Sequence, residues 1–265
     1  GIPAYQYHLR EVECRAMHGG RPPNVGLSTR GLFNEIHIPK PRFDREFKQV
    51  LKDARDSGHL DLQWRSLTQL LPGVDTLTAL TSLRMNNNLF ADIPDEIAGI
   101  QTLVTLHVAN NRLTRINENV CKLKKLRYLY CEDNRITELP PKITFMIRLR
   151  ELRVCRNQLS RLPERIGKCL GLQVLELQLN RLTKLPASIV QCRSLKRLTL
   201  QKNYIRRLPL GFDRLTALEH LDLNQNRMKN LPLEMSNMRS LKELLLSSNR
   251  IEKLDESFSQ GNLRT

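Results

Sequence analysis

Tyrosine and arginine side chains at regular spacing are the residues of this chain best suited to recognition chemistry. Tyr128 and Tyr130 flank Leu129, and Arg153 stands later in the chain at an equivalent place of a recurring pattern. Exposed tyrosine beside arginine is a combination that contributes strongly to binding energy at protein interfaces. The chemistry that these residues favour is therefore non-covalent contact with another macromolecule.

A second set of residues suited to chemistry is basic. It consists of arginines that follow a recurring asparagine directly or within four residues: Arg112, Arg135, Arg181, Arg206, Arg207, Arg227 and Arg250. Guanidinium groups neutralise phosphates whatever base is attached, so this set could contact an RNA backbone along one edge of the fold. Aromatic side chains that would stack on bases are not expected beside it.

Catalytic chemistry has little support in the sequence. His107 and Cys155 are the candidate base and nucleophile, and no acid stands at a spacing that would orient either. The chain has no glycine-rich phosphate loop, no close pair of metal ligands and no nucleophile elbow. We expect no catalytic residues, no metal, no cofactor and no small-molecule substrate, and we expect a protein that is not an enzyme.

The elements that must position these side chains come from a 23-residue period. An asparagine returns at this spacing eight times, as Asn88, Asn111, Asn134, Asn157, Asn180, Asn203, Asn226 and Asn249. Ahead of each one, apolar and polar residues alternate, as in Leu175-Glu176-Leu177, which predicts a short strand with one solvent-exposed face. A single unit cannot bury its own apolar side chains, so the period predicts a stacked solenoid.

The asparagine and the proline of each unit predict how the strands are connected. The asparagine amide offers two donors and an acceptor, enough to bond turns in its own unit and in the next. Proline, as in Leu162-Pro163, removes a backbone N–H and predicts an irregular or short helical return segment. Because strands lie closer together than the bulkier return segments, the stack should bend with its sheet on the inside.

These units resemble the leucine-rich repeat family, and in particular its 23-residue intracellular subclass, seen in the Ras-suppressor, Scribble and Erbin proteins. The mark of the subclass is Leu-Pro-x-x-Ile, found as Leu139-Pro140 with Ile143 and again in the next three units, with Phe212 in the last. Asn117 and Asp255 replace the proline in two units. An arginine after the asparagine is also a common form of this repeat, so the basic set need not bind anything.

The resemblance implies an α/β solenoid. It would be a leucine-rich repeat horseshoe with a curved parallel sheet on the concave face and irregular or short helical return segments on the convex face. It also implies that the concave face binds another protein. At the outward strand positions we predict protein contacts from Arg84, His107, Tyr128, Tyr130, Glu132, Arg153, Arg156, Glu176, Arg197 and Asp222. The alternative is that any solvent-exposed strand carries polar residues without a specific contact.

The repeats divide the chain into three parts. Residues 1–41 show no helical or strand period and predict an extended basic N-terminal arm. Residues 42–57 have apolar side chains at helical spacing and predict an N-terminal capping helix, with Trp64 packed beneath it. Residues 57–265 form the solenoid, with a degenerate first repeat at 57–79 and eight repeats over 80–263, the last one incomplete.

Charge and cysteine content bear on the partner and the compartment. The formal net charge is +16, which favours a partner with an acidic surface or a nucleic acid. The six cysteines are not paired beside either end of the array, so we expect them reduced and the protein intracellular. The cytoplasm is the expected compartment and the mitochondrion the alternative. No apolar run is long enough to span a membrane, so we expect no membrane contact.

Two functions fit these observations. The leading one is a non-catalytic scaffold that binds a protein partner on the concave face of its repeats. The alternative is a structural subunit of a large assembly, such as a ribonucleoprotein, anchored by the basic edge and the N-terminal arm. The arm distinguishes them, because it should be ordered only beside other chains if the subunit hypothesis holds.

Overall fold

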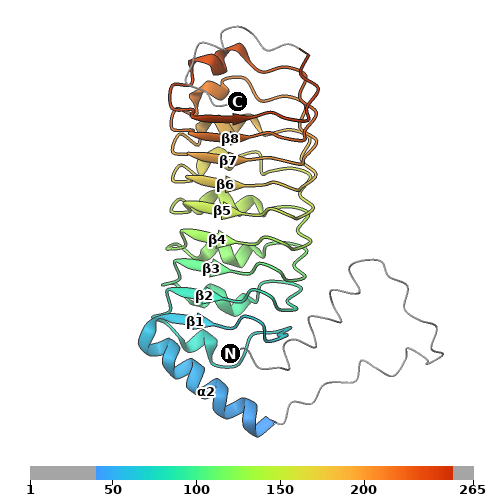
Figure 1. The fold of residues 1–265 in the computed structure, drawn as a ribbon. Helices are drawn as coiled ribbons and strands as arrows, with labels where there is room; N and C mark the ends of the chain where they lie inside the picture. Colours follow the sequence, from blue (N-terminus) through green and yellow to red (C-terminus); the bar gives the residue numbers. More distant parts are fainter. Residues whose placement is uncertain (1–39, 253–265) are drawn as a thin grey trace, which may run out of the picture. The chain divides into compact units, whose positions relative to one another are not determined.

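The computed structural model of the protein describes residues 40–252, with side chains from residue 47 onward. The predicted N-terminal arm up to residue 39 and the predicted incomplete end of the last repeat, from residue 253, lie outside the described residues. Within the described range the repeats form one parallel sheet whose strands follow the order of the chain (Figure 1). The stacked parallel sheet predicted from the repeat period is confirmed.

Each strand contains three residues. The nine strands are β1 (His59–Asp61), β2 (Ser82–Arg84), β3 (Thr105–His107), β4 (Tyr128–Tyr130), β5 (Glu151–Arg153), β6 (Val174–Glu176), β7 (Arg197–Thr199), β8 (His220–Asp222) and β9 (Glu243–Leu245). The central leucine of each strand points inward and is at most 1% exposed. The first and third residues therefore point outward, and each strand residue pairs with its equivalent in the next repeat.

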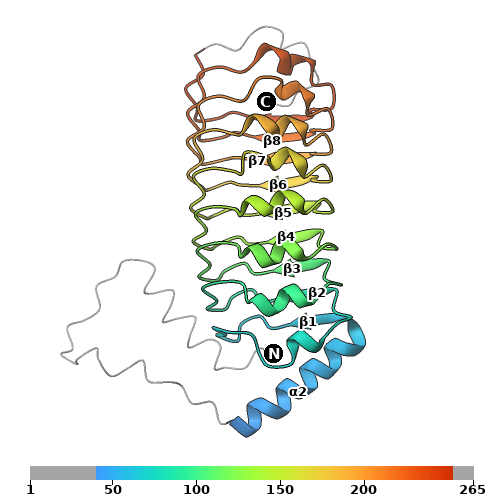
Figure 2. The ribbon, with the colours of Figure 1, turned by 180° about the vertical axis from the view of Figure 1, so that it is seen from behind.

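Short 3-10 helices form the return segments. They are η1 (Val74–Thr76), η2 (Asp95–Gly99), η3 (Glu118–Lys122), η4 (Pro141–Phe145), η5 (Ile166–Lys168), η6 (Ala187–Gln191), η7 (Phe212–Arg214) and η8 (Leu233–Asn237). They lie on the opposite face from the sheet (Figures 1 and 2). Asn117, which replaces the proline before η3, caps that helix by accepting a 3.0 Å hydrogen bond from the Asn119 N–H. The departure from the proline pattern thus keeps the helix start satisfied.

The recurring asparagines form a ladder of side-chain hydrogen bonds. In the middle of the stack, Asn157 Nδ2 donates to the carbonyls of Cys131, Val154 and Cys155 at 3.0 to 3.3 Å. Its Oδ1 accepts from the Ile136 N–H at 2.9 Å. Cys131 and Ile136 belong to the preceding unit, so the expectation that the amide would bond to the next unit was wrong. The reason is geometric, because the turn after β5 directs the Asn157 side chain toward the turn that follows β4 in the preceding unit.

Helix α2 (Lys40–Ser57) precedes the first strand and starts two residues earlier than the expected helix. Phe47 and Ala54 are buried, and Gly58, with a φ of 71°, ends the helix by donating to the Ala54 carbonyl. Arg55 donates a 3.4 Å hydrogen bond to Thr76 of the first repeat. Trp64, expected beneath this helix, is 51% exposed. A capping role for α2 remains a proposal.

Candidate functional site

The third residue of each strand contributes to a row on the concave face, the side of the sheet that points away from the return helices. Parallel pairing places five predicted residues side by side in that row: Arg84, His107, Tyr130, Arg153 and Glu176. Directly paired residues begin about 4.8 Å apart, so their side chains can touch. We call these five residues the Tyr130 cluster.

Tyr130 is the centre of the cluster. Its ring centroid is 4.5 Å from that of His107, with the two planes inclined by 36°. Arg153 neighbours Tyr130 on the side opposite His107, and its Cζ atom lies 5.0 Å from the centroid of the tyrosine ring. A guanidinium at this distance is attracted to the ring face by about 0.5–2 kcal/mol. The sheet therefore presents an aromatic pair whose position is fixed by a neighbouring cation.

Two carboxylates hold the guanidinium of Arg153. One is Glu151 on the same strand, which forms a close ion pair with it, and the other is Glu176, whose Oε2 lies 3.8 Å from Arg153 Nε. Glu151 was not among the predicted contact residues. It precedes Arg153 on the strand with one residue between them, which places both side chains on one face and is the signal that could have identified it.

Burial and neighbouring charges keep both rings of the cluster neutral. Partial burial, followed by the positive charges of Arg84 and Arg153, lowers the pKa of His107. Burial, followed by the negative charge of Glu151, raises the pKa of Tyr130 to about 12. At neutral pH the cluster is thus a neutral imidazole and a neutral phenol between two guanidinium groups.

The structure does not bring every predicted contact residue into the Tyr130 cluster. Tyr128 pairs with Glu151 in the neighbouring row of first strand positions, and Arg197 lies two strands further along that row. Asp222 is separated from Glu176 by the strand that carries Thr199. Arg156 stands at a turn with a φ of 53° and forms an exposed 3.4 Å ion pair with Asp133.

The candidate nucleophile Cys155 lies beside Glu132, the remaining predicted residue. Burial, followed by the charge of Glu132, raises the pKa of the Cys155 thiol to about 12. The thiol therefore stays protonated and is a poor nucleophile. Among residues 47–252, no group of three or more histidine, cysteine, aspartate or glutamate side chains is arranged to hold a metal.

The buried carboxyl group of Glu132 should make the folding stability of the protein depend on pH. Its Oε2 is buried and has no hydrogen-bond partner in the described part of the chain, and burial raises the pKa of the carboxyl. A raised folded-state pKa means that stability is present at low pH and is lost as the pH rises through that pKa. We expect Glu132→Gln, which cannot ionise, to unfold at higher urea concentration than the natural protein at pH 8, with a smaller difference at pH 4.

Urea titrations of both proteins at the two pH values would measure this effect. Glu96→Gln, at an exposed glutamate, serves as the control and should show little difference at either pH. An equal gain for Glu132→Gln at both pH values would mean that the buried carboxylate is not the cause.

The predicted phosphate-binding edge follows the strands and is exposed at Arg112, Arg135, Arg181, Arg206, Arg207 and Arg250. Arg227 is half-buried, and its guanidinium lies 4.5 Å from the ring centroid of Tyr204. An aromatic side chain thus does stand on this edge, contrary to expectation, and an arginine stacks on it. Acids are also present nearby, since Arg115 pairs with Asp92 and Arg161 with Glu138.

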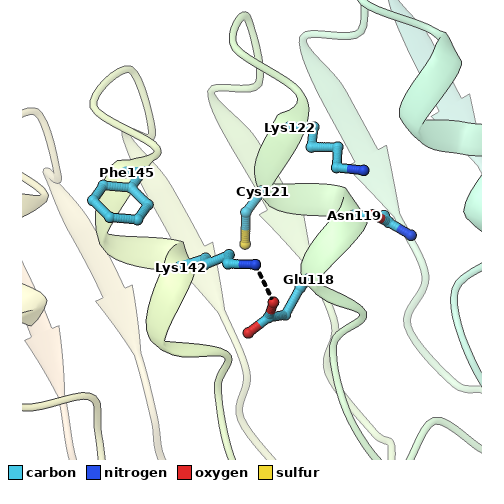
Figure 3. A pocket seen from close by; sticks show the side chains of 6 residues that line it. All are labelled: Glu118, Asn119, Cys121, Lys122, Lys142 and Phe145. Carbon is cyan, nitrogen blue, oxygen red and sulfur yellow. Dashed lines mark ion pairs between the residues drawn. The ribbon is translucent and has the colours of Figure 1, made fainter.

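A hollow of about 270 Å³ lies on the convex side between η3 and η4 (Figure 3). An ion pair of 2.6 Å between Lys142 and Glu118 bridges the two return helices there. Burial, followed by the charge of Glu118, raises the pKa of the Cys121 thiol to about 12. Sequence reasoning did not identify this hollow, because the repeat pattern does not show that the side chains of two neighbouring return helices leave a space between them. A protonated thiol beside an already paired lysine offers no reactive group.

Two family models match the chain. One, described as a leucine-rich repeat region, matches residues 141–263, and the other, described as leucine-rich repeats in two copies, matches residues 101–143. Together they cover more than half of the sequence. The chain belongs to the leucine-rich repeat family. No match was found among curated protein sequences.

Solved structures of the same fold are similar to this chain. A leucine-rich repeat protein of Leptospira interrogans is 32% identical over 81% of this chain, with a TM-score of 0.76. The plant peptide hormone receptor RGFR1, solved with RGF2, is 30% identical over 73%, with a TM-score of 0.66. The ectodomain of the Arabidopsis thaliana receptor kinase GASSHO1/SCHENGEN3, solved with CASPARIAN STRIP INTEGRITY FACTOR 2, is 26% identical over 78%, with a TM-score of 0.69.

This chain is shorter than those relatives. It spans 56% of the Leptospira chain and 32% and 26% of the two plant chains. In residues 40–252, no helix combines the length and the apolar character needed to cross a bilayer.

Proposed function

We propose that the chain is a non-catalytic scaffold that binds a protein partner through the Tyr130 cluster. The observation that carries this proposal is the position of Tyr130 between the ring of His107 and the guanidinium of Arg153. An aromatic side chain held in place by its neighbours loses little conformational freedom on binding, which is the property of an interface anchor.

The charges of the cluster indicate what the partner should carry. Arg153 is already paired with Glu151 and Glu176, whereas Arg84 is exposed and forms no ion pair with any described residue. A partner carboxylate would find its counter-charge at Arg84, and an apolar or aromatic side chain would pack on Tyr130 and His107. This is a narrower form of the acidic partner surface expected from the net charge.

The relatives support a protein or peptide partner. Two plant relatives were solved as complexes, one of them described as a peptide hormone receptor with RGF2. Leucine-rich repeat domains in general serve as interaction scaffolds, and the sheet of this chain leaves its outer face open to contact.

The finer parts of the proposal rest on sequence features. The Leu-Pro-x-x-Ile return segments support the 23-residue intracellular subclass, and the five cysteines of the described range, all unpaired, support an intracellular, cytoplasmic location. The protonated thiols of Cys121 and Cys155 support a role without catalysis.

A double variant tests the proposal. Tyr130→Ala with Arg153→Ala should weaken binding of the partner by about 30-fold or more, because anchor residues of this kind contribute about 2 kcal/mol or more. The partner would first be captured from native extract by crosslinking and purified, and its affinity for both proteins would then be measured by calorimetry. The melting temperature should change little, since both side chains are only half-buried.

The chain offers a matched control. Tyr204→Ala with Arg227→Ala removes the other stacked tyrosine and arginine pair, which lies on the edge that follows the strands. That variant should bind the partner as the natural protein does. Equal affinity of the Tyr130 variant and the natural protein, or equal losses in both double variants, would refute a specific role for the Tyr130 cluster.

A further inference from the structure

The edge of the sheet at the N-terminal ends of the strands is strongly basic. Four segments lead into β4 to β7, namely residues 121–127, 145–150, 168–173 and 191–196. Together they contain nine lysines and arginines, all exposed, and no aspartate or glutamate. We call this surface the leading edge. It lies at the opposite end of the strands from the arginines singled out in the sequence.

The cations of the leading edge are not neutralised within the protein. None of the nine takes part in any ion pair among the described residues, whereas arginines on the other edge do, as Arg115 does with Asp92. Like charges on neighbouring units repel one another, which lowers stability. An external polyanion would remove that repulsion.

Three of these cations line a hollow. Arg127, Arg148 and Arg150 surround a space of about 290 Å³, with Ile147 and Gly171 as the other lining residues. The Arg150 N–H donates to the Arg127 carbonyl at 2.8 Å, so these two residues lie side by side just before the adjacent strands β5 and β4. A Cβ at Gly171 would lie 3.0 Å from the Ile147 carbonyl oxygen. Glycine at this position therefore keeps the hollow free of a further side chain.

We propose that the leading edge binds the phosphate backbone of a single-stranded nucleic acid, with one phosphate in the hollow between Arg127, Arg148 and Arg150. Arginine can bond two phosphate oxygens at once, and three guanidinium groups around one space suit a tetrahedral anion. This surface is separate from the Tyr130 cluster and does not depend on it.

The extent of the leading edge favours a strand of nucleic acid over other anions. The cations continue over four successive units, or about 15 Å at the usual strand spacing, which exceeds the size of one phosphate. A hollow offers no contact to a flat membrane surface. Phe145, the last residue of η4, lines the convex-side hollow and stands where the chain turns toward β5. It is 66% exposed, occupies the same position of the repeat as Lys122 and Lys168, and offers a ring face on which a base can stack.

Fluorescence anisotropy of the full chain with a labelled 20-nucleotide oligouridine tests the proposal, with oligothymidine of the same length as a second probe. Arg127→Gln, Arg148→Gln and Arg150→Gln combined should lower the affinity at 50 mM salt by about tenfold or more. The negative slope of log K against log salt should become shallower by about 2, since each lost phosphate contact removes about 0.7 from its magnitude. Phe145→Ala should weaken binding and leave the slope unchanged.

A triple variant on the opposite edge is the control for net charge. Arg112→Gln, Arg135→Gln and Arg181→Gln combined remove the same charge and should leave most of the affinity. Equal losses in the two triple variants would overturn the proposal, and so would the absence of binding to either probe at 50 mM salt. Tighter binding of a phosphoserine peptide or of anionic phosphatidylserine vesicles than of both oligonucleotides would also overturn it. Circular dichroism would verify that the exposed substitutions leave the fold intact.

Discussion

Replacement of Asn157 by alanine is expected to lower the free energy of unfolding by about 3–5 kcal/mol. The side chain makes four hydrogen bonds, and their loss is unequal in cost. The Cys131 and Val154 carbonyls keep a second partner, because Asn134 and Asn180 also donate to them. The Ile136 N–H loses its acceptor and stays buried, which alone costs about 1–3 kcal/mol. The three lost donor bonds account for the rest, at about 0.5–1 kcal/mol each.

The asparagine ladder explains why this effect should exceed that of an ordinary polar substitution. Asn157 is buried and joins its own unit to the preceding one, so its removal weakens the interface between repeats as well as one turn. The stability of a repeat array depends on those interfaces. Loss of the amide in the middle of the stack should therefore reduce the cooperativity of unfolding along with its midpoint.

Urea denaturation of the variant and the natural protein measures the effect. Asn157→Asp keeps an acceptor for the Ile136 N–H but places a second oxygen against three carbonyls, so we expect it to be at least as unstable as the alanine variant. Asn230→Ala, at an exposed asparagine outside the ladder, is the control and should change stability by less than about 0.5 kcal/mol. A loss below about 1 kcal/mol for Asn157→Ala, the net worth of a single ordinary hydrogen bond, would show that the ladder contributes little.

The fold could be predicted because the repeated residues are the ones that point inward. Leucines such as Leu152 and amides such as Asn157 occupy fixed positions of the period, and their burial determines strand, turn and stacking direction. The period does not show which neighbouring unit an amide reaches. That choice depends on where the turn leaves the side chain in space, and for this reason the predicted direction of the hydrogen bonds was wrong.

The candidate surfaces were less accessible to sequence reasoning. A search at the repeat interval pairs Tyr130 with Arg153 and finds a column of arginines after the asparagines. It does not find the leading edge, because Arg148 joins this surface from a different position of the repeat than the one that Arg127 and Arg150 share. It also treats Glu151 as an ordinary polar strand residue, although the structure pairs it with the guanidinium beside Tyr130. Contacts between unlike positions of the repeat require coordinates, unless the two residues flank one strand position, as Glu151 and Arg153 do.

Gly167 lies in η5, where the backbone of the neighbouring return helix η6 approaches closely. An added Cβ would lie 2.0 Å from the Ser188 carbonyl oxygen and 2.9 Å from the Gln191 Cβ, both belonging to η6. Atoms do not approach so closely, so Gly167→Ala must push the two helices apart. Ile166 and Ile189, which are fully buried beside this contact, would lose part of their packing.

We expect Gly167→Ala to lower the free energy of unfolding by about 3 kcal/mol, at the upper end of the usual cost of overpacking a core. Gly99→Ala is the matched control, because Gly99 also belongs to a return helix but has no atom within 4 Å of its added Cβ. That variant should gain about 0.4–1 kcal/mol, since alanine has fewer unfolded conformations than glycine. Opposite shifts of the two urea midpoints would establish that the spacing of return helices is limited by the backbone at η5 and η6. Shifts of the same sign and size would show that the helices can separate there at little cost, and that the sheet and the asparagine ladder alone fix the stack.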